Sequence, residues 1–262
     1  MSKPFRGSAF PLDKEGLTEV IDRMNVGAAE LWAVLSVETR GCGFLPDRRP
    51  LILFERHIFS RETGHRYDAS HPDISNKMPG GYGDGGAHQY ERLETALALD
   101  RKAALRSASW GIGQVMGFNA ADAGYADAEE MVAAMTISEH NQLLAMAGEI
   151  MNNRLERSLR AHDWPTFARG YNGPDYARNS YDTRLAAAYQ KFALGLPDLV
   201  VRTAQIYLMY LGYKLGTVDG ILGRFTRSAL NEFQERHGIA ITNDVDEDLL
   251  SILKLGVEKL EP

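Results

Sequence analysis

Apolar side chains recur every three or four residues over most of this chain, which is the period of an α-helix. Leu17, Val20, Ile21 and Met24 form one such stripe, and a second stripe runs up to Glu38. Further helices are predicted over 90–106, over 180–195, and after the capping residues Asp127, Ser138 and Asp163. The one strong strand candidate is the short apolar run 51–54. The pattern therefore predicts a mainly α-helical protein with a small β element.

A break in this pattern divides the chain near residue 196. Leu185, Tyr189 and Phe192 share one face of a helix that Gly195 is suited to cap, and that Pro197 cannot continue. A new periodic pattern starts directly afterwards. We therefore predict two domains, 1–195 and 197–262.

The composition is that of an ordinary soluble protein and argues against several kinds of ligand. Of the 262 residues, 44% are hydrophobic, and 29 basic against 35 acidic side chains give a formal net charge of −6. No basic tract interleaves with aromatic residues, which argues against nucleic acid. The single cysteine, Cys42, excludes an intramolecular disulfide and a thiolate metal site. Because the histidines are scattered and lack the HExxH spacing, we expect no metal and no other cofactor.

The sequence also lacks the apolar segments that membranes require. Residues 1–16 contain no apolar core of signal-peptide length, and no stretch approaches the roughly 20 apolar residues of a membrane helix. We therefore expect a soluble monomer that is made in the cytosol and does not insert into a membrane. If it acts outside the cytosol, another factor must release it.

Glu38 is the most informative residue of the first domain. It ends an apolar helical run and shares one helix face with Leu31, Val34 and Leu35. Burial among aliphatic side chains and a position at the negative end of the helix dipole both predict a raised pKa. A carboxylic acid that stays protonated near neutral pH can protonate a leaving sugar oxygen, as glycosidases require. The alternative is a helix-end Glu38 that faces solvent or pairs with Arg40.

Glu55 is a candidate for the second acidic group of such a site. It follows the predicted strand directly, and a strand that folds back over the helix end would bring it towards Glu38. Glycosidases use this second group to hold a water or to stabilise an oxocarbenium ion. The alternative is a surface ion pair of Glu55 with Arg49 or Arg56. The glycine-rich segment 68–86 that follows is predicted to be a long loop.

Three blocks of the first domain carry a family resemblance. They read ELWAVLSVETRGCGFLPDRRPLILFERHIF, SASWGIGQVMGFN and ARGYNGPDYARNSYDTRLAAAY. In this order they resemble the N-acetylmuramidase domain of phage endolysins, a distant relative of goose-type lysozyme and of the soluble lytic transglycosylases. The resemblance covers nearly all of 10–195. It implies an α+β lysozyme-like fold in which Glu38 is the catalytic glutamate.

The same resemblance implies a set of sugar-binding residues. It matches a G-x-x-Q loop, which lines the glycan groove, to residues 111–114, with Ser109 and Trp110 before it, and a Tyr-Asn pair to Tyr171 and Asn172. The amides of Gln114 and Asn172 offer donors and acceptors for acetamido groups. The rings of Trp110 and Tyr171 are suited to stack on pyranose faces.

The second domain resembles a different family. The stretch VVRTAQIYLMYLGYKLGTVDGILGRFTRSALNEFQERHGIAITNDVDEDLLSIL is similar to the small peptidoglycan-binding domain of bacterial and phage wall enzymes. That family implies a three-helix bundle, in which Asp219 and Gly220 form a turn and Thr226 caps the next helix. We expect the groove beside this turn, with Tyr213 near it, to contact the wall, unless Tyr213 is a core aromatic. A helix-turn-helix DNA module is the alternative, but the acidic C-terminal segment argues against phosphate contacts.

Together the two resemblances imply an endolysin whose partner is bacterial peptidoglycan. It would cleave the β-1,4 bond between N-acetylmuramic acid and N-acetylglucosamine, and would reach the wall through a holin-type membrane lesion. Each domain is expected to work alone, 1–195 in cleavage and 197–262 in wall binding. One alternative is a lytic transglycosylase, which forms a 1,6-anhydro product with the same acid and needs no second carboxylate. The other is a non-enzymatic wall-binding virion component, against which Glu38 and Gln114 count.

Overall fold

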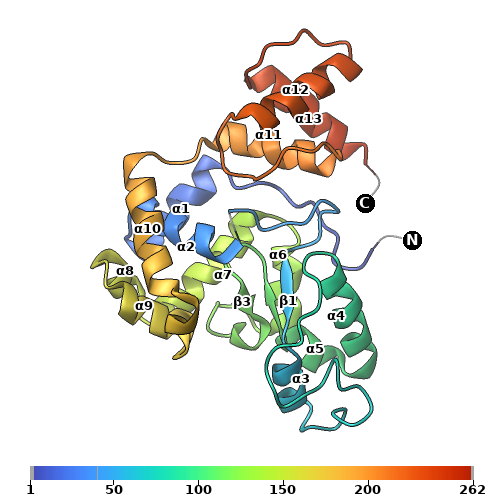
Figure 1. Cartoon of the computed structure of the whole chain (residues 1–262), viewed down its shortest axis with the longest axis vertical. Coiled ribbons are helices and arrows are strands. Elements are labelled where there is room, and N and C mark those ends of the chain that lie inside the picture. The colour runs from blue at the N-terminus through green and yellow to red at the C-terminus, as the bar shows by residue number, and fades with distance from the viewer. Residues whose placement is uncertain (1–2, 40, 261–262) are drawn as a thin grey trace.

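A computed structural model describes residues 3–39 and 41–260 of the chain. Its elements in chain order are α1 (Lys14–Met24), α2 (Ala28–Thr39), β1 (Ile52–Phe54), α3 (Arg56–Glu62), α4 (His88–Leu99), α5 (Arg101–Arg106), β2 (Ala108–Trp110), β3 (Val115–Met116), η1 (Gly117–Asn119), α6 (Ala128–Met135), α7 (Glu139–Asn152), α8 (Glu156–Arg160), α9 (Trp164–Tyr171), η2 (Tyr176–Asn179), α10 (Tyr181–Leu194), α11 (Leu199–Tyr210), α12 (Arg224–Arg236) and α13 (Glu247–Glu258). The elements up to α10 form a large part, and α11–α13 form a bundle at one end of it (Figure 1). The predicted mainly helical class is confirmed. Within the described residues, no helix has the length and apolar character needed to cross a membrane.

The central helix of the large part is α2. Five consecutive residues, 31–35, are all buried, so apolar side chains surround most of its circumference and neighbours must enclose it. Helix α10 packs along it, and the rings of Trp32 and Phe192 meet at a centroid distance of 6.3 Å. The predicted helix that ends near Glu38 is therefore present, and it lies in the core of the large part.

A small antiparallel sheet lies beside this helical core. Its strand order is β1-β2-β3, with Ile52 opposite Trp110 and Ser109 opposite Met116. The sequence predicted β1 but not β2 or β3, which are three and two residues long and lack an alternating pattern. The predicted loop 68–86 contains no helix or strand.

Helix boundaries follow the local caps. The side chains of Asp127, Ser138 and Asp163 each accept a hydrogen bond from a backbone N–H in the first turn of their helix, as predicted. The single helix expected over 90–106 is wrong. Its break lies at Asp100, which has an extended backbone and accepts a bond of 3.0 Å from the N–H of Ala103, so that α4 ends and α5 begins there.

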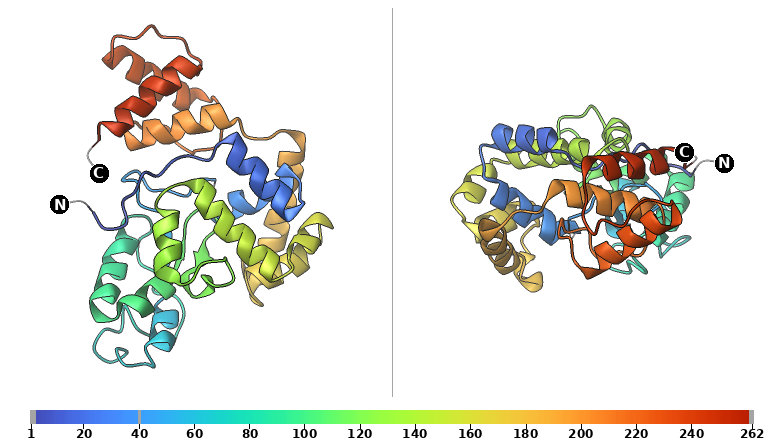
Figure 2. Two further views of the ribbon diagram at one scale, coloured as in Figure 1. Left: turned by 180° about the vertical axis from the view of Figure 1, so that it is seen from behind. Right: turned by 90° about the horizontal axis from the view of Figure 1, so that it is seen from above.

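The bundle has the three helices that the sequence implied, but its core is shared with the large part. Leu208, Leu230 and Leu253 are fully buried between the bundle helices, and Ala9 and Phe44 from the large part complete the same cluster. The segment that carries Ala9 runs between the bundle and the large part before α1 begins (Figure 2). The two parts therefore meet over an apolar contact.

Candidate active site

Glu38 lies one residue before the end of α2, partly buried. Thr39 fixes this helix end, because its hydroxyl contacts the carbonyl oxygens of Leu35 at 3.3 Å and of Ile112 at 3.1 Å. Burial raises the pKa of Glu38 to about 7. This is the direction that the sequence predicted. Arg40, the alternative partner, lies outside the described residues.

Two residues of α10 lower the pKa of the Glu38 carboxyl. The hydroxyl of Tyr181, which is buried, donates a hydrogen bond to the Oε1 atom of Glu38. Arg184, one turn later, donates to the backbone oxygen of Val37 at 3.0 Å. Both side chains lower the pKa of Glu38 and so oppose part of the effect of burial. Sequence reasoning missed both residues, although they are one turn apart on a helix whose other face is apolar.

The turn between β2 and β3 holds the predicted G-x-x-Q loop together. The hydroxyl of Ser109 donates to the side-chain oxygen of Gln114 at 2.8 Å, and the Gln114 amide nitrogen donates to the Gly111 oxygen at 2.9 Å. Both ends of the Gln114 amide are therefore engaged within the protein. Gly111 has a φ of +70°, and a Cβ atom there would lie 2.7 Å from Gln142. Glycine is required at this position for both reasons.

The expected sugar-stacking role of Trp110 is wrong. Its side chain is fully buried, its indole N–H donates to the Leu105 oxygen at 3.1 Å, and its ring packs on Phe5 at 5.5 Å. Trp110 lies in β2 with both faces of the strand covered, so no face of the ring is open to a ligand. Its role is to anchor the strand that leads to the 111–114 turn.

Tyr171 and Asn172 lie at the end of α9, on a polar cavity of about 360 Å³. The Tyr171 hydroxyl donates to the Gly113 oxygen at 2.6 Å, and its ring stacks on Phe167. Asn172 is exposed, and its side chain has no partner among the hydrogen bonds of the described residues. The structure thus brings Tyr171, Asn172 and Gln114 to one cavity.

A carboxyl that the sequence analysis did not select lines the same cavity. Glu149 of α7 is 8% exposed and accepts a hydrogen bond of 2.5 Å from the Asn119 side chain. Burial raises its pKa to about 7, and the charges of Asp122 and Glu38 act in the same direction. Glu149 and Glu38 also both raise the pKa of the Tyr171 hydroxyl. The available sequence signal was its place one turn after Met146 on a buried helix face.

Glu55 lies between β1 and α3, where it is the N-terminal flanking residue of the helix. Its carboxylate is 3.1 Å from the Nδ1 atom of His57, and its side chain is 15% exposed. Burial raises its pKa, against the opposing effects of His57 and of the Tyr82 hydroxyl from the 68–86 loop. The alternative pair with Arg49 is wrong, because that guanidinium pairs with an aspartate and packs on a tyrosine ring. Arg56 instead donates to a backbone oxygen of the loop.

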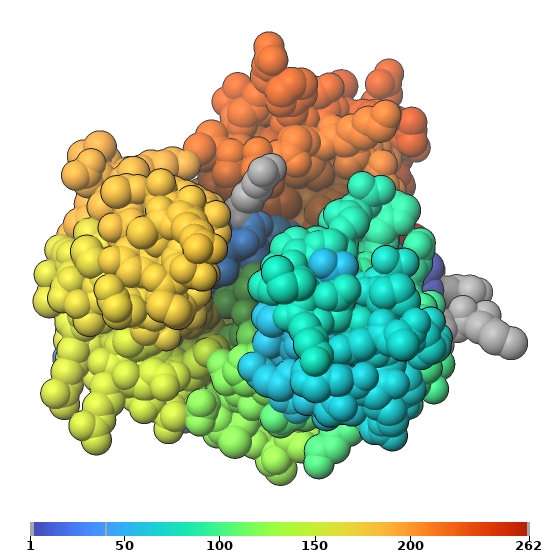
Figure 3. Space-filling model, turned by 60° about the horizontal axis from the view of Figure 1, so that its bottom comes forward, coloured from blue at the N-terminus to red at the C-terminus, as the bar shows by residue number. Residues whose placement is uncertain are grey.

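The large part has a hollow in its surface. Figure 3 shows it between one lobe that contains α8, α9 and the start of α10, and a second lobe that contains α3 and the 68–86 loop. Blue and green segments of the chain form its floor, which agrees with α2 and the region around the β2–β3 turn. Glu55, which directly precedes α3, belongs to a different lobe from Tyr181, which begins α10.

In the bundle, the predicted turn at Asp219 and Gly220 is present. The Gln205 side chain binds both of its backbone N–H groups, at 3.0 and 2.9 Å. Gly220 has a φ of +70°, and its oxygen accepts a bond of 3.2 Å from the N–H of Asp198. The turn therefore faces the large part, and Asp219 lines a small cavity there with Trp32.

Two expectations about the bundle are corrected by its geometry. Thr226 is not a helix cap, because α12 begins at Arg224; the buried Thr226 hydroxyl instead accepts a bond of 3.0 Å from Gln205. The turn and Tyr213 do not share a groove. Tyr213 is half-buried, meets the Phe233 ring edge-on, and lines a separate surface depression with Arg236.

Comparisons with known proteins agree with this arrangement. The model of the N-acetylmuramidase family matches residues 27–193, and the model of a peptidoglycan binding domain matches residues 199–253. The crystal structure of the Burkholderia AP3 phage endolysin is 38% identical, with a TM-score of 0.63 over 73% of this chain and 72% of that chain. No curated protein matches. The chain therefore belongs to the N-acetylmuramidase family and is a lysozyme-type peptidoglycan hydrolase that carries a wall-binding module.

Proposed function

We propose that this hydrolase cleaves the β-1,4 bond between N-acetylmuramic acid and N-acetylglucosamine with Glu38 as its general acid. The observation that supports this is the Glu38 carboxyl near the end of α2, which has a raised pKa of about 7 and accepts a hydrogen bond from the Tyr181 hydroxyl. Much of the Glu38 population is then protonated near neutral pH and able to protonate the leaving oxygen. The Tyr181 hydroxyl, which already donates to the carboxyl, stabilises the carboxylate that proton transfer leaves behind.

For the second acidic role we propose Glu55. Its carboxylate is held by His57 in the other lobe of the hollow, where it can hold the water that attacks the oxocarbenium-like centre. Glu149 is the competing candidate, because the Glu38 charge acts directly on it and it lines the cavity with Tyr171. A neutral Glu149 is also suited to hydrogen-bond a sugar substituent.

We propose that some of the remaining site residues contact the ligand and that others support the fold. The exposed amide of Asn172 and the half-buried ring of Tyr171 contact the sugar, while Ser109 and Gln114 shape the turn beside them. In the bundle, Tyr213 is the proposed wall contact because it lines an open depression. Asp219, Gly220 and Thr226 support the fold of the module rather than touch the wall.

Domain boundaries, oligomeric state and the route to the wall are also proposals. The boundaries 1–195 and 197–262 are supported by the two family matches, each of which falls within one of them. Action as a monomer, after synthesis in the cytosol and release through a holin-type lesion, is the expectation from the resemblance to phage endolysins.

The identity of the bond and of the acid is tested by mass spectrometry of muropeptides released from purified sacculi. We expect products with muramic acid at the reducing end, whereas 1,6-anhydro products would assign a lytic transglycosylase. Glu38→Gln should lower the rate by about 10²–10⁴-fold, and the exposed Glu94→Gln, on α4, is the matched control. A Glu38→Gln variant that keeps more than about a tenth of the wild-type rate would contradict the assignment.

The same assay separates the two candidates for the second role. Glu55→Gln should lower the rate by about 10²-fold or more, and Glu149→Gln should have the smaller effect. The reverse order would move the role to Glu149. Full activity in both variants, together with anhydro products, would remove the second carboxylate from the mechanism.

A further inference from the structure

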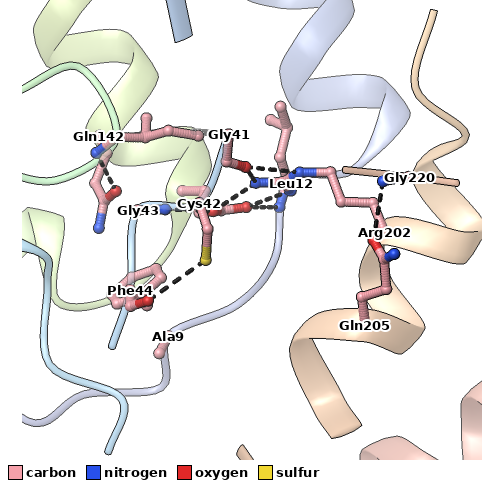
Figure 4. Close-up of polar contacts among 12 residues, drawn as sticks. Ala9, Leu12, Gly41, Cys42, Gly43, Phe44, Gln142, Arg202, Gln205 and Gly220 are labelled. Atoms are coloured by element: carbon pink, nitrogen blue, oxygen red, sulfur yellow. Dashed lines mark hydrogen bonds and ion pairs between the residues drawn. The ribbon is translucent and has the colours of Figure 1, made fainter. Parts of the chain in front are cut away.

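The wall-binding module sends one charged side chain into the muramidase core. Arg202 of α11 is fully buried, and two of its guanidinium nitrogens donate to the two carboxylate oxygens of Glu139 at 2.6 and 2.7 Å. The guanidinium also donates to the backbone oxygen of Gly41, with an Nε distance of 3.1 Å (Figure 4). One side chain of the module therefore joins α7 to the segment that follows α2.

The partners of Arg202 are fully satisfied and belong to the large part. Glu139, also fully buried, accepts further hydrogen bonds from the backbone N–H groups of Leu12 at 2.8 Å and of Gly43 at 2.9 Å. Gly41 and Gly43 flank Cys42, so both ends of this short turn are held by the Arg202–Glu139 pair. A planar guanidinium is suited to such paired contacts, because its donors lie in a fixed fork.

This turn follows the catalytic helix directly. Gly41 is three residues after Glu38, and α2 ends at Thr39, whose hydroxyl reaches the oxygen of Ile112 in the β2–β3 turn. The N–H of Ile112 in turn donates to Gln142, one turn after Glu139 on α7. Arg202 thus bonds the turn that follows the end of α2, where Glu38 lies.

A second connection runs through α10. This helix carries Tyr181 and Arg184, the two residues that act on Glu38, and continues through the short segment 195–198 into α11. Asp198 caps α11 and is tied to Gly220. Arg202 lies one turn into α11, so α11 is bonded to the segment after α2 through Arg202 and is joined to α10 through the chain.

We propose that Arg202 is a positioning residue of the muramidase, through which the wall-binding module holds Glu38 in its buried place beside Tyr181. The module is then a structural part of the active site as well as its link to the wall. This inference rests on the proposed role of Glu38 as the acid. Without Arg202, the helix end is free to shift and water gains access to Glu38. Its pKa then falls towards the ordinary value of a glutamate.

The test must separate positioning from simple charge compensation. Arg202→Met alone leaves a buried carboxylate without its cation, so Arg202→Met combined with Glu139→Gln is the informative variant. It removes both charges and still leaves the Gly41 oxygen without its donors. Arg202→Lys keeps the charge but not the fork, and Arg227→Met, which changes an exposed arginine of α12, is the control.

All variants are measured in the full chain by thermal unfolding, by sedimentation with purified sacculi, and by the pH dependence of kcat/KM. We expect the double variant to bind sacculi like wild type, to lose at least tenfold in kcat, and to lose activity at a lower pH than wild type. The kcat and the pH limit of Arg202→Lys should lie between those of the double variant and of wild type. Arg227→Met should match wild type.

Two results would overturn the proposal. One is a folded double variant with wild-type kcat and an unchanged alkaline limb, which is the fall of kcat/KM at high pH. The other is a loss of activity that matches a loss of sedimentation while the limb stays in place. If the double variant does not fold, an unchanged limb in Arg202→Lys overturns it. Failure of the Glu38 assignment would be recognised separately, because Glu38→Gln would then keep wild-type activity. That result does not depend on the Arg202 variants.

Discussion

At the scale of single residues, the pKa of the proposed acid Glu38 results from burial, which raises it, and from the Tyr181 hydroxyl and Arg184, which lower it. Burial favours the neutral acid, and the Tyr181 hydroxyl favours the carboxylate. The result is a pKa of about 7, above the ordinary glutamate value of 4.5 and close to neutral pH. An acid in this range both holds its proton and releases it during the reaction.

Removal of the Tyr181 hydroxyl should therefore move the pH profile. Because this hydrogen bond lowers the pKa of Glu38, Tyr181→Phe should raise that pKa. If Glu38 is the acid, the alkaline limb of the kcat/KM profile is expected near pH 7 in the wild type, and it should move to higher pH in the variant. The control is Tyr189→Phe on the same helix, whose ring packs on His162. A limb that stays in place or moves to lower pH would contradict this role for Tyr181.

A raised carboxyl pKa also predicts how stability changes with pH. The folded state binds the Glu149 proton more tightly than the unfolded state, since the pKa rises from 4.5 to about 7 on folding. This stabilisation is complete below the unfolded pKa and is lost as the pH rises through about 7. At about 1.4 kcal/mol per pKa unit, the loss is at most about 3.5 kcal/mol.

Glu149→Gln should remove that dependence. Relative to wild type, the variant should gain stability between pH 4.5 and pH 8, measured as the midpoint of urea unfolding at each pH. The exposed Glu94→Gln should follow the wild-type curve. Parallel curves for Glu149→Gln and wild type would mean that Glu149 is ionised in the folded protein.

The residue scale also shows how far sequence reasoning reaches. Glu38 could be selected because its helix stripe and its position at the helix end lie within eight residues of chain. Tyr181 and Glu149 were not selected, because their local patterns do not show that tertiary packing of α10 and α7 brings them to Glu38. Trp110 was misassigned because the sequence does not tell a ring that faces a groove from a ring that faces the core.

At the scale of elements, the β2–β3 turn leaves little room for a side chain at Gly111. Gly111→Ala would combine a left-handed φ of +70° with a Cβ atom 2.7 Å from Gln142. We expect a loss of roughly 1–3 kcal/mol in unfolding free energy from the backbone alone, and lower activity because the 111–114 turn must shift. Gly124→Ala has a similar φ, +94°, with no atom within 4 Å of its Cβ, and should lose only stability. Equal activity in the two variants would show that the turn tolerates displacement.

Elements were predicted well where a local signal marks them. Helices with a capping side chain, such as those after Asp127 and Ser138, began where the sequence indicated. The break at Asp100 was missed because apolar residues continue across it at helical spacing. Strands β2 and β3 were missed because their pairing depends on contact with β1, which no local pattern reveals.

At the scale of the whole molecule, two domains in the sequence do not mean two independent folding units. The bundle core includes Ala9 and Phe44, the Tyr210 hydroxyl donates to the Ala9 oxygen at 3.0 Å, and Arg202 pairs with Glu139. The sequence indicated the boundary at 195–197 because helix periodicity ends there. It gave no sign of this interface, whose residues lie far apart in the chain.

We therefore expect the full chain to unfold in one cooperative transition. In differential scanning calorimetry, the calorimetric and van't Hoff enthalpies should agree, since neither part can lose the shared core alone. A chain that ends at residue 195 should melt at a lower temperature, because it exposes Phe44 and removes Arg202, the ion-pair partner of Glu139. Glu139→Gln in the shortened chain should restore part of the lost melting temperature. Two resolved transitions in the full chain, or an unchanged melting temperature after truncation, would show that the bundle is only tethered to the muramidase.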